Sequence, residues 1–170
     1  MTKNTGAEAF AKVESSVSDA LSGETLKSAL EFIAYLKSSG MAVDTETPHP
    51  QFYYMDEWAC MPVFFKDDND PRGKLFICWN DGDICECADI TVTDALKEFA
   101  RANVQKCWSC GGCDDPSASK KRTRTVFGER HDNVCCNIFQ FADIDEAKLK
   151  MIIQLMELWK RTVAESKRGR

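Results

Sequence analysis

The sequence contains little histidine and proline, and it has no long hydrophobic run. Two histidines and five prolines occur among 170 residues, and no stretch of about 18 apolar residues is present that would span a membrane. The N-terminus lacks the basic and then apolar pattern of a secretory leader, so we expect a cytoplasmic protein without a membrane partner. Phosphate-binding glycine loops, the G-x-S-x-G nucleophile motif and the H-E-x-x-H motif are absent as well. Because no catalytic motif remains, we favour a binding protein over an enzyme.

Cysteine, by contrast, is abundant. The chain has nine cysteines, and an odd number cannot all pair within one molecule. Cys107, Cys110 and Cys113 form a C-x2-C-x2-C run that contains a Gly-Gly turn. Thiolates at this spacing can bind one zinc ion at about 2.3 Å each, and a tetrahedral site needs a fourth ligand. We expect Cys135 in that position, with Cys136 and His131 as alternatives.

Two other uses of the same cysteines stay open. An iron–sulfur cluster also accepts four thiolates, although the residues after Cys113 lack the fourth cysteine of the bacterial ferredoxin pattern. The other alternative is a thiol-dependent redox enzyme. The thioredoxin-like βαβ pattern that such an enzyme would have around the cysteine run is missing, which argues against this alternative. The other cysteines are predicted to be small buried hydrophobic residues, namely Cys60, Cys78, Cys85 and Cys87. A hairpin turn at 81–82 predicts that Cys78 lies opposite Cys85.

Charge is distributed unevenly along the chain, which has a net charge of -5. Residues 44–98 hold thirteen acidic and four basic residues, whereas residues 99–170 hold nine acidic and fourteen basic residues. A polyanion would be repelled by the acidic middle, so the composition argues against nucleic-acid binding. The basic run at 120–124 can instead offset the negative charge of a zinc–thiolate centre.

Hydrophobic periodicity predicts an α+β fold, with a mainly antiparallel sheet flanked by helices in the order ααββββαββα. Helices are expected over 7–21 and 22–39, from Thr93 to about 106, and from Asp143, which with Glu146 resembles a capping box. Strands are expected in the segments 51–54, 58–65, 75–79, 84–87, 125–127 and 134–141. The first two of these segments are expected to form a hairpin, and the last two are expected to pair with each other. The segment 44–50 is predicted to be a linker, with His49 exposed between two prolines.

The domain prediction follows from these elements. Residues 1–22 form an N-terminal helix that we expect to be peripheral. Residues 23–165 form a single domain that includes a cysteine-rich loop at 107–136, and residues 166–170 form a basic tail. Aromatic residues of the sheet are further expected to wall a pocket for a small molecule or a protein segment, namely Tyr54, Trp58, Phe64 and Trp79.

Several short motifs add a resemblance. They include Tyr35-Leu36-Lys37-x-x-Gly40-Met41, Leu96-Lys97-Glu98-Phe99-Ala100, Thr125-Val126-Phe127-Gly128-Glu129 and Asp132-Asn133-Val134-Cys135, together with 54–60, 139–141 and 155–158. Across residues 26–163 the chain resembles a family of small uncharacterised bacterial proteins. The resemblance implies a small α+β domain with a cysteine-rich loop and no established activity. It also implies Cys135 rather than Cys136 as the distal ligand, and it weakens His131, which stands where the family is expected to have an aromatic residue.

Overall fold

The computed structural model describes residues 6–64, 75–79, 92–106 and 123–168, except for the side chains of three residues inside strands. Its helices are α1 (Ala7–Ala20), α2 (Gly23–Ser38), α3 (Asp94–Ala102) and α5 (Glu146–Arg168). Its strands are β1 (Ala42–Asp44), β2 (Gln51–Tyr54), β3 (Glu57–Phe64), β4 (Leu75–Trp79), β5 (Val104–Lys106), β6 (Thr123–Val126), β7 (Glu129–Asp132) and β8 (Val134–Phe141). The predicted α+β fold is confirmed.

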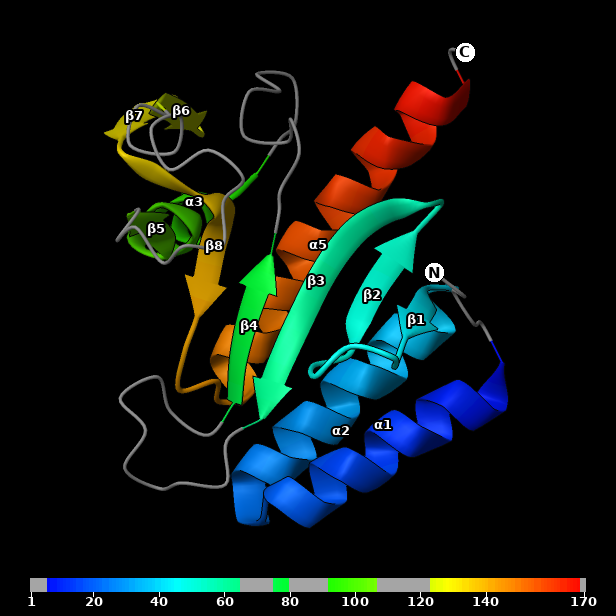
Figure 1. Cartoon of the computed structure of the whole chain (residues 1–170). Coiled ribbons are helices and arrows are strands. Elements are labelled where there is room, and N and C mark those ends of the chain that lie inside the picture. The colour runs from blue at the N-terminus through cyan, green and yellow to red at the C-terminus, as the bar shows by residue number, and fades with distance from the viewer. Residues whose placement is uncertain (1–5, 65–74, 80–91, 107–122, 169–170) are drawn as a thin grey trace.

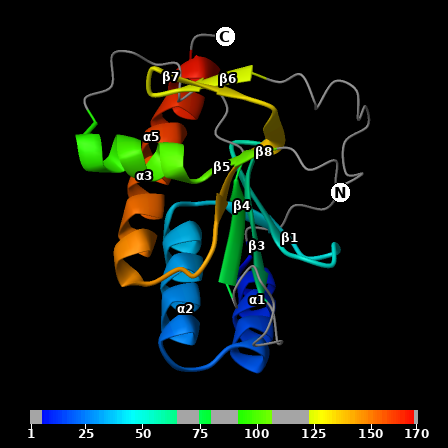
Figure 2. The ribbon, with the colours of Figure 1, turned by 90° about the vertical axis from the view of Figure 1, so that its left-hand side faces the viewer.

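Six of the strands form one sheet with the order β1-β2-β3-β4-β8-β5, and each neighbouring pair is antiparallel. Figures 1 and 2 show that α2, α3 and α5 lie on one face of this sheet, and α1 packs beside α2 near β1. Side chains that alternate along the strands toward this face join the helices in the main core. The sheet residues of this core include Val43, Phe52, Cys60, Leu75, Ile77, Trp79, Phe139 and Phe141.

The N-terminal helix is part of this core, so the expectation of a peripheral helix is wrong. Phe10 of α1 is 1% exposed and its ring lies 5.9 Å from the ring of Phe52, centroid to centroid. Val13 and Val17 are buried on the same side of the helix. The apolar spacing that predicted the helix therefore also marks the face by which it is buried.

Helix ends follow local sequence signals, with one correction. Thr93 caps α3 as predicted, since its hydroxyl accepts a hydrogen bond from the Leu96 amide at 3.3 Å. Gly40 follows α2 with a φ of 72°, a conformation that costs glycine little. At α5, however, Asp145 is the cap: its Oδ1 accepts a hydrogen bond from the Lys148 amide at 2.8 Å. The predicted capping pair was Asp143 and Glu146. Asp143 lies two residues before the observed cap, and Glu146 is the first residue of the helix.

Strand pairing differs from the prediction at three places. β4 is paired on both of its edges, by β3 and by β8, so Cys78 lies opposite Met61 and Gln140 rather than opposite Cys85. Cys85 itself lies outside the described residues. The segment around 125–127 does not pair with β8, because β6 forms a separate hairpin with β7.

The third difference concerns short strands at the edges of the sheet. Asp44 was predicted to belong to the linker, but it is the last residue of β1. β5 follows α3 where we expected the helix to continue. α5 also extends to Arg168, and so it includes residues that were assigned to a tail. Strands of three residues are too short to show a periodic signal in the sequence.

Candidate functional site

The proposed zinc ligands fall largely outside the described residues. Cys107, Cys110 and Cys113 are not described, and neither is the side chain of Cys136. Cys135 lies near the start of β8 and is 4% exposed. Within the described ranges, no group of three or more His, Cys, Asp or Glu side chains is arranged to hold a metal ion.

The described strands nevertheless fix where the chain enters the cysteine run. Lys106, the last residue of β5, is paired with Val134, the first residue of β8. Cys107 follows directly after Lys106, and Cys135 follows directly after Val134. The described residues that directly precede Cys107 and Cys135 are therefore neighbours across this strand pair.

A hairpin beside this edge carries the alternative ligand His131. The hairpin of β6 and β7 is tied to α3 by Arg101, whose Nε donates to the Val126 carbonyl oxygen at 3.3 Å and whose Nη2 donates to the Phe127 carbonyl oxygen. The Arg101 Nε also lies 3.6 Å from Glu129 Oε2, and Glu129 Oε1 lies 3.6 Å from His131 Nε2. The imidazole is 16% exposed and is directed at a carboxylate of its own hairpin.

Two of the four cysteines predicted as buried hydrophobic residues are described, and both are buried. Cys60 is fully buried on the helix-covered face, and Cys78 is 5% exposed on the opposite face. Burial is the main reason that the pKa of the Cys60 thiol is raised well above its usual value. Because only the thiolate is a nucleophile, Cys60 is an inert thiol at neutral pH.

The structure does not bring the four predicted wall residues together. Trp79 is fully buried in the main core against Phe139, at 5.4 Å between ring centroids, and Tyr54 packs on Trp159 of α5. Trp58 belongs to a small cluster on the other face of the sheet. Phe64 lines the pocket described next, whose other lining residues differ from those we expected.

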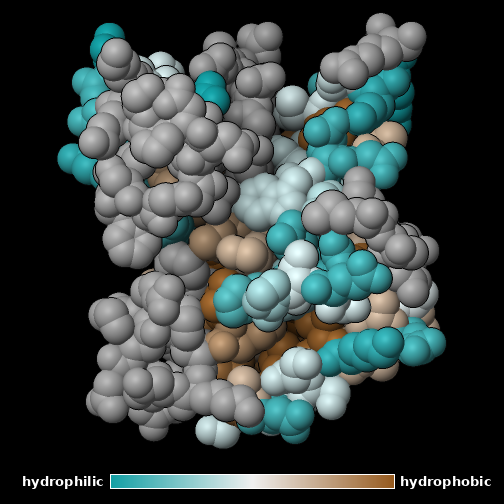
Figure 3. All heavy atoms as spheres, in the orientation of Figure 1, coloured by the Kyte–Doolittle hydropathy of each residue, from teal (hydrophilic) through white to brown (hydrophobic). Residues whose placement is uncertain are grey.

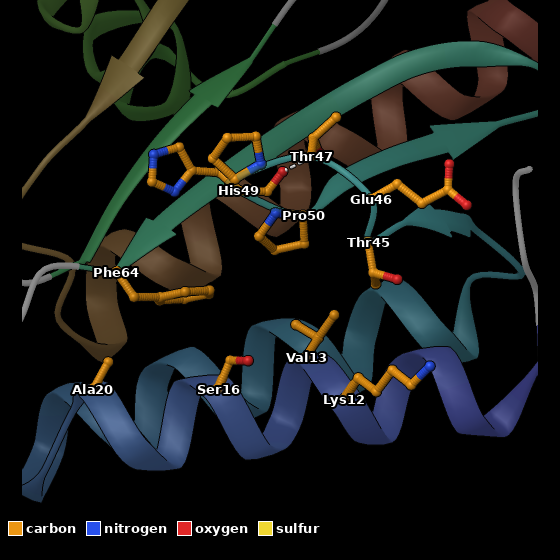
Figure 4. A pocket seen from close by; sticks show the side chains of 11 residues that line it. Lys12, Val13, Ser16, Ala20, Thr45, Glu46, Thr47, His49, Pro50 and Phe64 are labelled. Atoms are coloured by element: carbon orange, nitrogen blue, oxygen red, sulfur yellow. Dashed lines mark hydrogen bonds between the residues drawn. The ribbon is translucent and has the colours of Figure 1, made fainter. Parts of the chain in front are cut away.

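This pocket lies between α1 and the loop at 45–50, and it has a volume of about 640 Å³ (Figure 4). Hydrophobic atoms lie at the bottom of the hollow and hydrophilic ones along its rim (Figure 3). Its lining comes from three segments: Lys12, Val13, Ser16 and Ala20 of α1, the loop residues Thr45, Glu46, Thr47, Pro48, His49 and Pro50, and Phe64 at the end of β3. Pockets of 300–1,000 Å³ with apolar walls and a few polar groups are typical small-molecule sites.

The loop of this pocket is held in shape by its own side chains. Asp44 is 1% exposed, and its Oδ1 accepts a hydrogen bond from the Glu46 amide at 2.9 Å. The Thr47 hydroxyl donates to the His49 carbonyl oxygen at 2.6 Å, and the prolines on either side of His49 fix their own φ angles. His49 is half-buried against the pocket, so the expectation of an exposed loop residue is wrong. The Pro-His-Pro sequence was the signal for this ordered loop.

A polar cluster lies on the helix-covered side of the sheet, between α2 and α5. Tyr35 donates its hydroxyl to Glu157 Oε1 at 2.8 Å, and Lys160 Nζ donates to the same oxygen at 2.8 Å. The Lys160 ammonium lies 5.5 Å from the ring centroid of Tyr35 and 5.6 Å from that of Tyr54. Burial, followed by the bond to Glu157, raises the pKa of Tyr35 far above its ordinary value, so this phenol stays protonated.

Comparison of the chain with protein-family models, with curated proteins and with solved structures found no match. The resemblance to small bacterial proteins therefore stays a prediction. In the parts of the chain that the structure describes, no helix has the length and apolar character needed to cross a membrane.

Proposed function

We propose that this protein is a zinc-stapled binding domain, in which Cys107, Cys110, Cys113 and Cys135 hold the metal at one edge of the sheet. The observation that carries the proposal is the pairing of Lys106 with Val134. The last described residue before the cysteine run, Lys106, therefore lies on the strand next to the one that bears Cys135.

The chemistry of the four side chains supports zinc over other divalent ions. Thiolates are soft ligands that prefer zinc or iron–sulfur clusters to magnesium or calcium. The Gly-Gly turn between Cys110 and Cys113 allows the backbone to fold closely around an ion. In a binding domain such a site has a structural role, since four protein ligands leave no open position for a substrate.

The second half of the proposal is that the domain binds a small molecule in the pocket between α1 and the loop at 45–50. The support is the volume of about 640 Å³ together with the mixture of apolar walls and rim charges. The loop is also preorganised by Asp44 and Thr47, so binding need not order it first.

Measuring the metal content of the full chain, purified without added metal, tests the zinc site. We expect one zinc per chain, and we expect Cys113→Ser and Cys135→Ser to lower both zinc content and melting temperature, since metal binding and folding are linked. Cys136→Ser should keep its zinc, and Cys78→Ala, which removes a buried thiol on another part of the sheet, is the matched control.

Other metal contents would replace the proposal. Iron with an equal amount of sulfide in a brown protein would identify an iron–sulfur cluster. A metal-free protein whose cysteine run reacts rapidly with an alkylating reagent would favour the redox enzyme instead. Loss of zinc in Cys136→Ser but not in Cys135→Ser would exchange the distal ligand.

A further inference from the structure

Two charges of opposite sign stand at the pocket, one on each side of it. Lys12 extends from α1, and Glu46 extends from the loop at 45–50 (Figure 4). No ion pair joins them, and Glu46 has no cationic partner among the described side chains. Lys12 does pair with Glu8 of its own helix at 3.3 Å, but the two side chains are 66% and 83% exposed. An exposed pair of this kind contributes little stability, so a ligand can compete for the ammonium.

Part of the lining of the same pocket is apolar. The ring of Phe64 extends from the end of β3 into the space between α1 and the loop, where Pro50 and Val13 also point (Figure 4). Val13 is only 3% exposed and belongs to the main core, so this wall is rigid. A flat or branched hydrocarbon group gains free energy by burying its apolar surface against such residues.

We propose that the pocket takes a free α-amino acid with an apolar, preferably aromatic, side chain. The ligand carboxylate would meet the Lys12 ammonium, the ligand ammonium would meet the Glu46 carboxylate, and the side chain would pack against Phe64. This inference rests on the proposed function, because it names the ligand class of the pocket assigned there. No reaction is implied.

The balance of charge distinguishes this class from simpler ligands. A monoanion would be attracted by Lys12 and repelled by Glu46, and a monocation would meet the reverse arrangement. A ligand that carries both signs can satisfy both groups. Free amino acids have this pair of charges on one carbon atom, with the side chain directed away from them.

Calorimetric titration of the zinc-loaded full chain with phenylalanine tests the proposal. Two analogues serve as probes: 3-phenylpropionate lacks the ammonium and phenethylamine lacks the carboxylate. We expect phenylalanine to bind, and each analogue to bind at least tenfold more weakly. Lys12→Gln and Glu46→Gln should each weaken phenylalanine binding about tenfold. Lys150→Gln is the matched control. Lys150 Nζ lies 2.6 Å from Glu146 Oε1 in a similar exposed ion pair, and neither residue lines this pocket.

The remaining outcomes separate this inference from the proposal on which it rests. If 3-phenylpropionate binds as tightly as phenylalanine, the ligand is a monoanion and the inference is wrong. If none of the three binds, but an apolar fluorescent dye binds and Phe64→Leu weakens it, the pocket stands and the ligand class is overturned. Binding that ignores both Lys12→Gln and Glu46→Gln would place the ligand elsewhere and overturn the inference too. Tight binding that depends on Lys12 and Glu46 in a protein without zinc would support the inference while the zinc proposal fails.

Discussion

Replacing Tyr35 by phenylalanine removes one hydroxyl from the contact between α2 and α5, and the structure indicates how much it should cost. A hydrogen bond to a charged group contributes about 1.5–3 kcal/mol. The acceptor Glu157 is 43% exposed, so water can replace part of the bond, and we expect Tyr35→Phe to destabilise the protein by about 1–2 kcal/mol. For a chain of this size, thermal denaturation followed by circular dichroism should show a fall in Tm of about 2–8 °C.

The matched control is Tyr54→Phe. The ring of Tyr54 also lies under the Lys160 ammonium, at 5.6 Å against 5.5 Å for Tyr35, so both variants keep the contact between ring and cation. Tyr54, however, makes no hydrogen bond through its hydroxyl to any residue that the structure describes. We expect this variant to lie within about 0.5 kcal/mol of the parent protein. Equal effects of the two substitutions would show that the bond to Glu157 contributes nothing measurable.

The same contact predicts a dependence on pH. Partial burial would by itself raise the pKa of Glu157, but the hydrogen bonds from Lys160 and Tyr35 prevail, and the pKa is lowered. A carboxyl whose pKa is lowered on folding stabilises the protein above its unfolded value, about 4.3, and this stabilisation is lost as the pH falls further. The difference in Tm between Tyr35→Phe and the parent should therefore stay nearly constant from neutral pH to about pH 4.3 and shrink as the pH falls below that value. A difference that also stays constant below about pH 4.3 would refute the assignment of the bond to the ionised carboxylate.

Three further predictions concern single side chains. Arg101→Ala should destabilise the protein by about 1–3 kcal/mol and speed hydrogen exchange mainly in β6 and β7, because Arg101 joins that hairpin to α3. A uniform change in exchange across the protein would contradict this prediction. Asp145→Ala should cost about 1 kcal/mol in chemical denaturation through loss of the α5 cap, whereas Asp143→Ala should cost less. Cys60 should resist alkylation in the native protein at neutral pH and react only on unfolding, as mass spectrometry of the labelled peptide can show.

Local sequence patterns predicted most of the helices and one hairpin, because these elements are determined by neighbouring residues. The apolar spacing in α1 and α2, the Thr93 cap of α3 and the hairpin of β2 and β3 are all signals within a few residues. The order of the sheet was not predictable in the same way. β4 lies between β3 and β8, and its partners Met61 and Gln140 are separated from Cys78 by 17 and 62 residues, so no local pattern specifies them.

The two candidate sites differ in the same respect. The cysteine run is visible in the sequence because its ligands are close together, and only the distal Cys135 depends on the fold. The pocket was missed because its walls come from three segments, α1, the loop at 45–50 and the end of β3. Phe64 was expected in a pocket with other aromatic residues, but alternation along the strands and a register shift in β2 separate these residues onto both faces of the sheet.

The sheet order also predicts that the two proposed sites act independently. β1 leads into the pocket loop at one edge of the sheet, and β5 leads into the cysteine run at the other edge. With about 4.8 Å between neighbouring strands, five spacings separate these edges by about 24 Å. Removing zinc with a chelator, at a temperature where the core remains folded, should therefore change phenylalanine affinity by less than about twofold, while hydrogen exchange quickens in β5 and β8. Calorimetry and exchange on the same sample measure both effects. A fall in affinity that follows zinc loss step by step, with the exchange of α1 unchanged, would show that the two edges are coupled through the sheet and would refute the independence of the two sites.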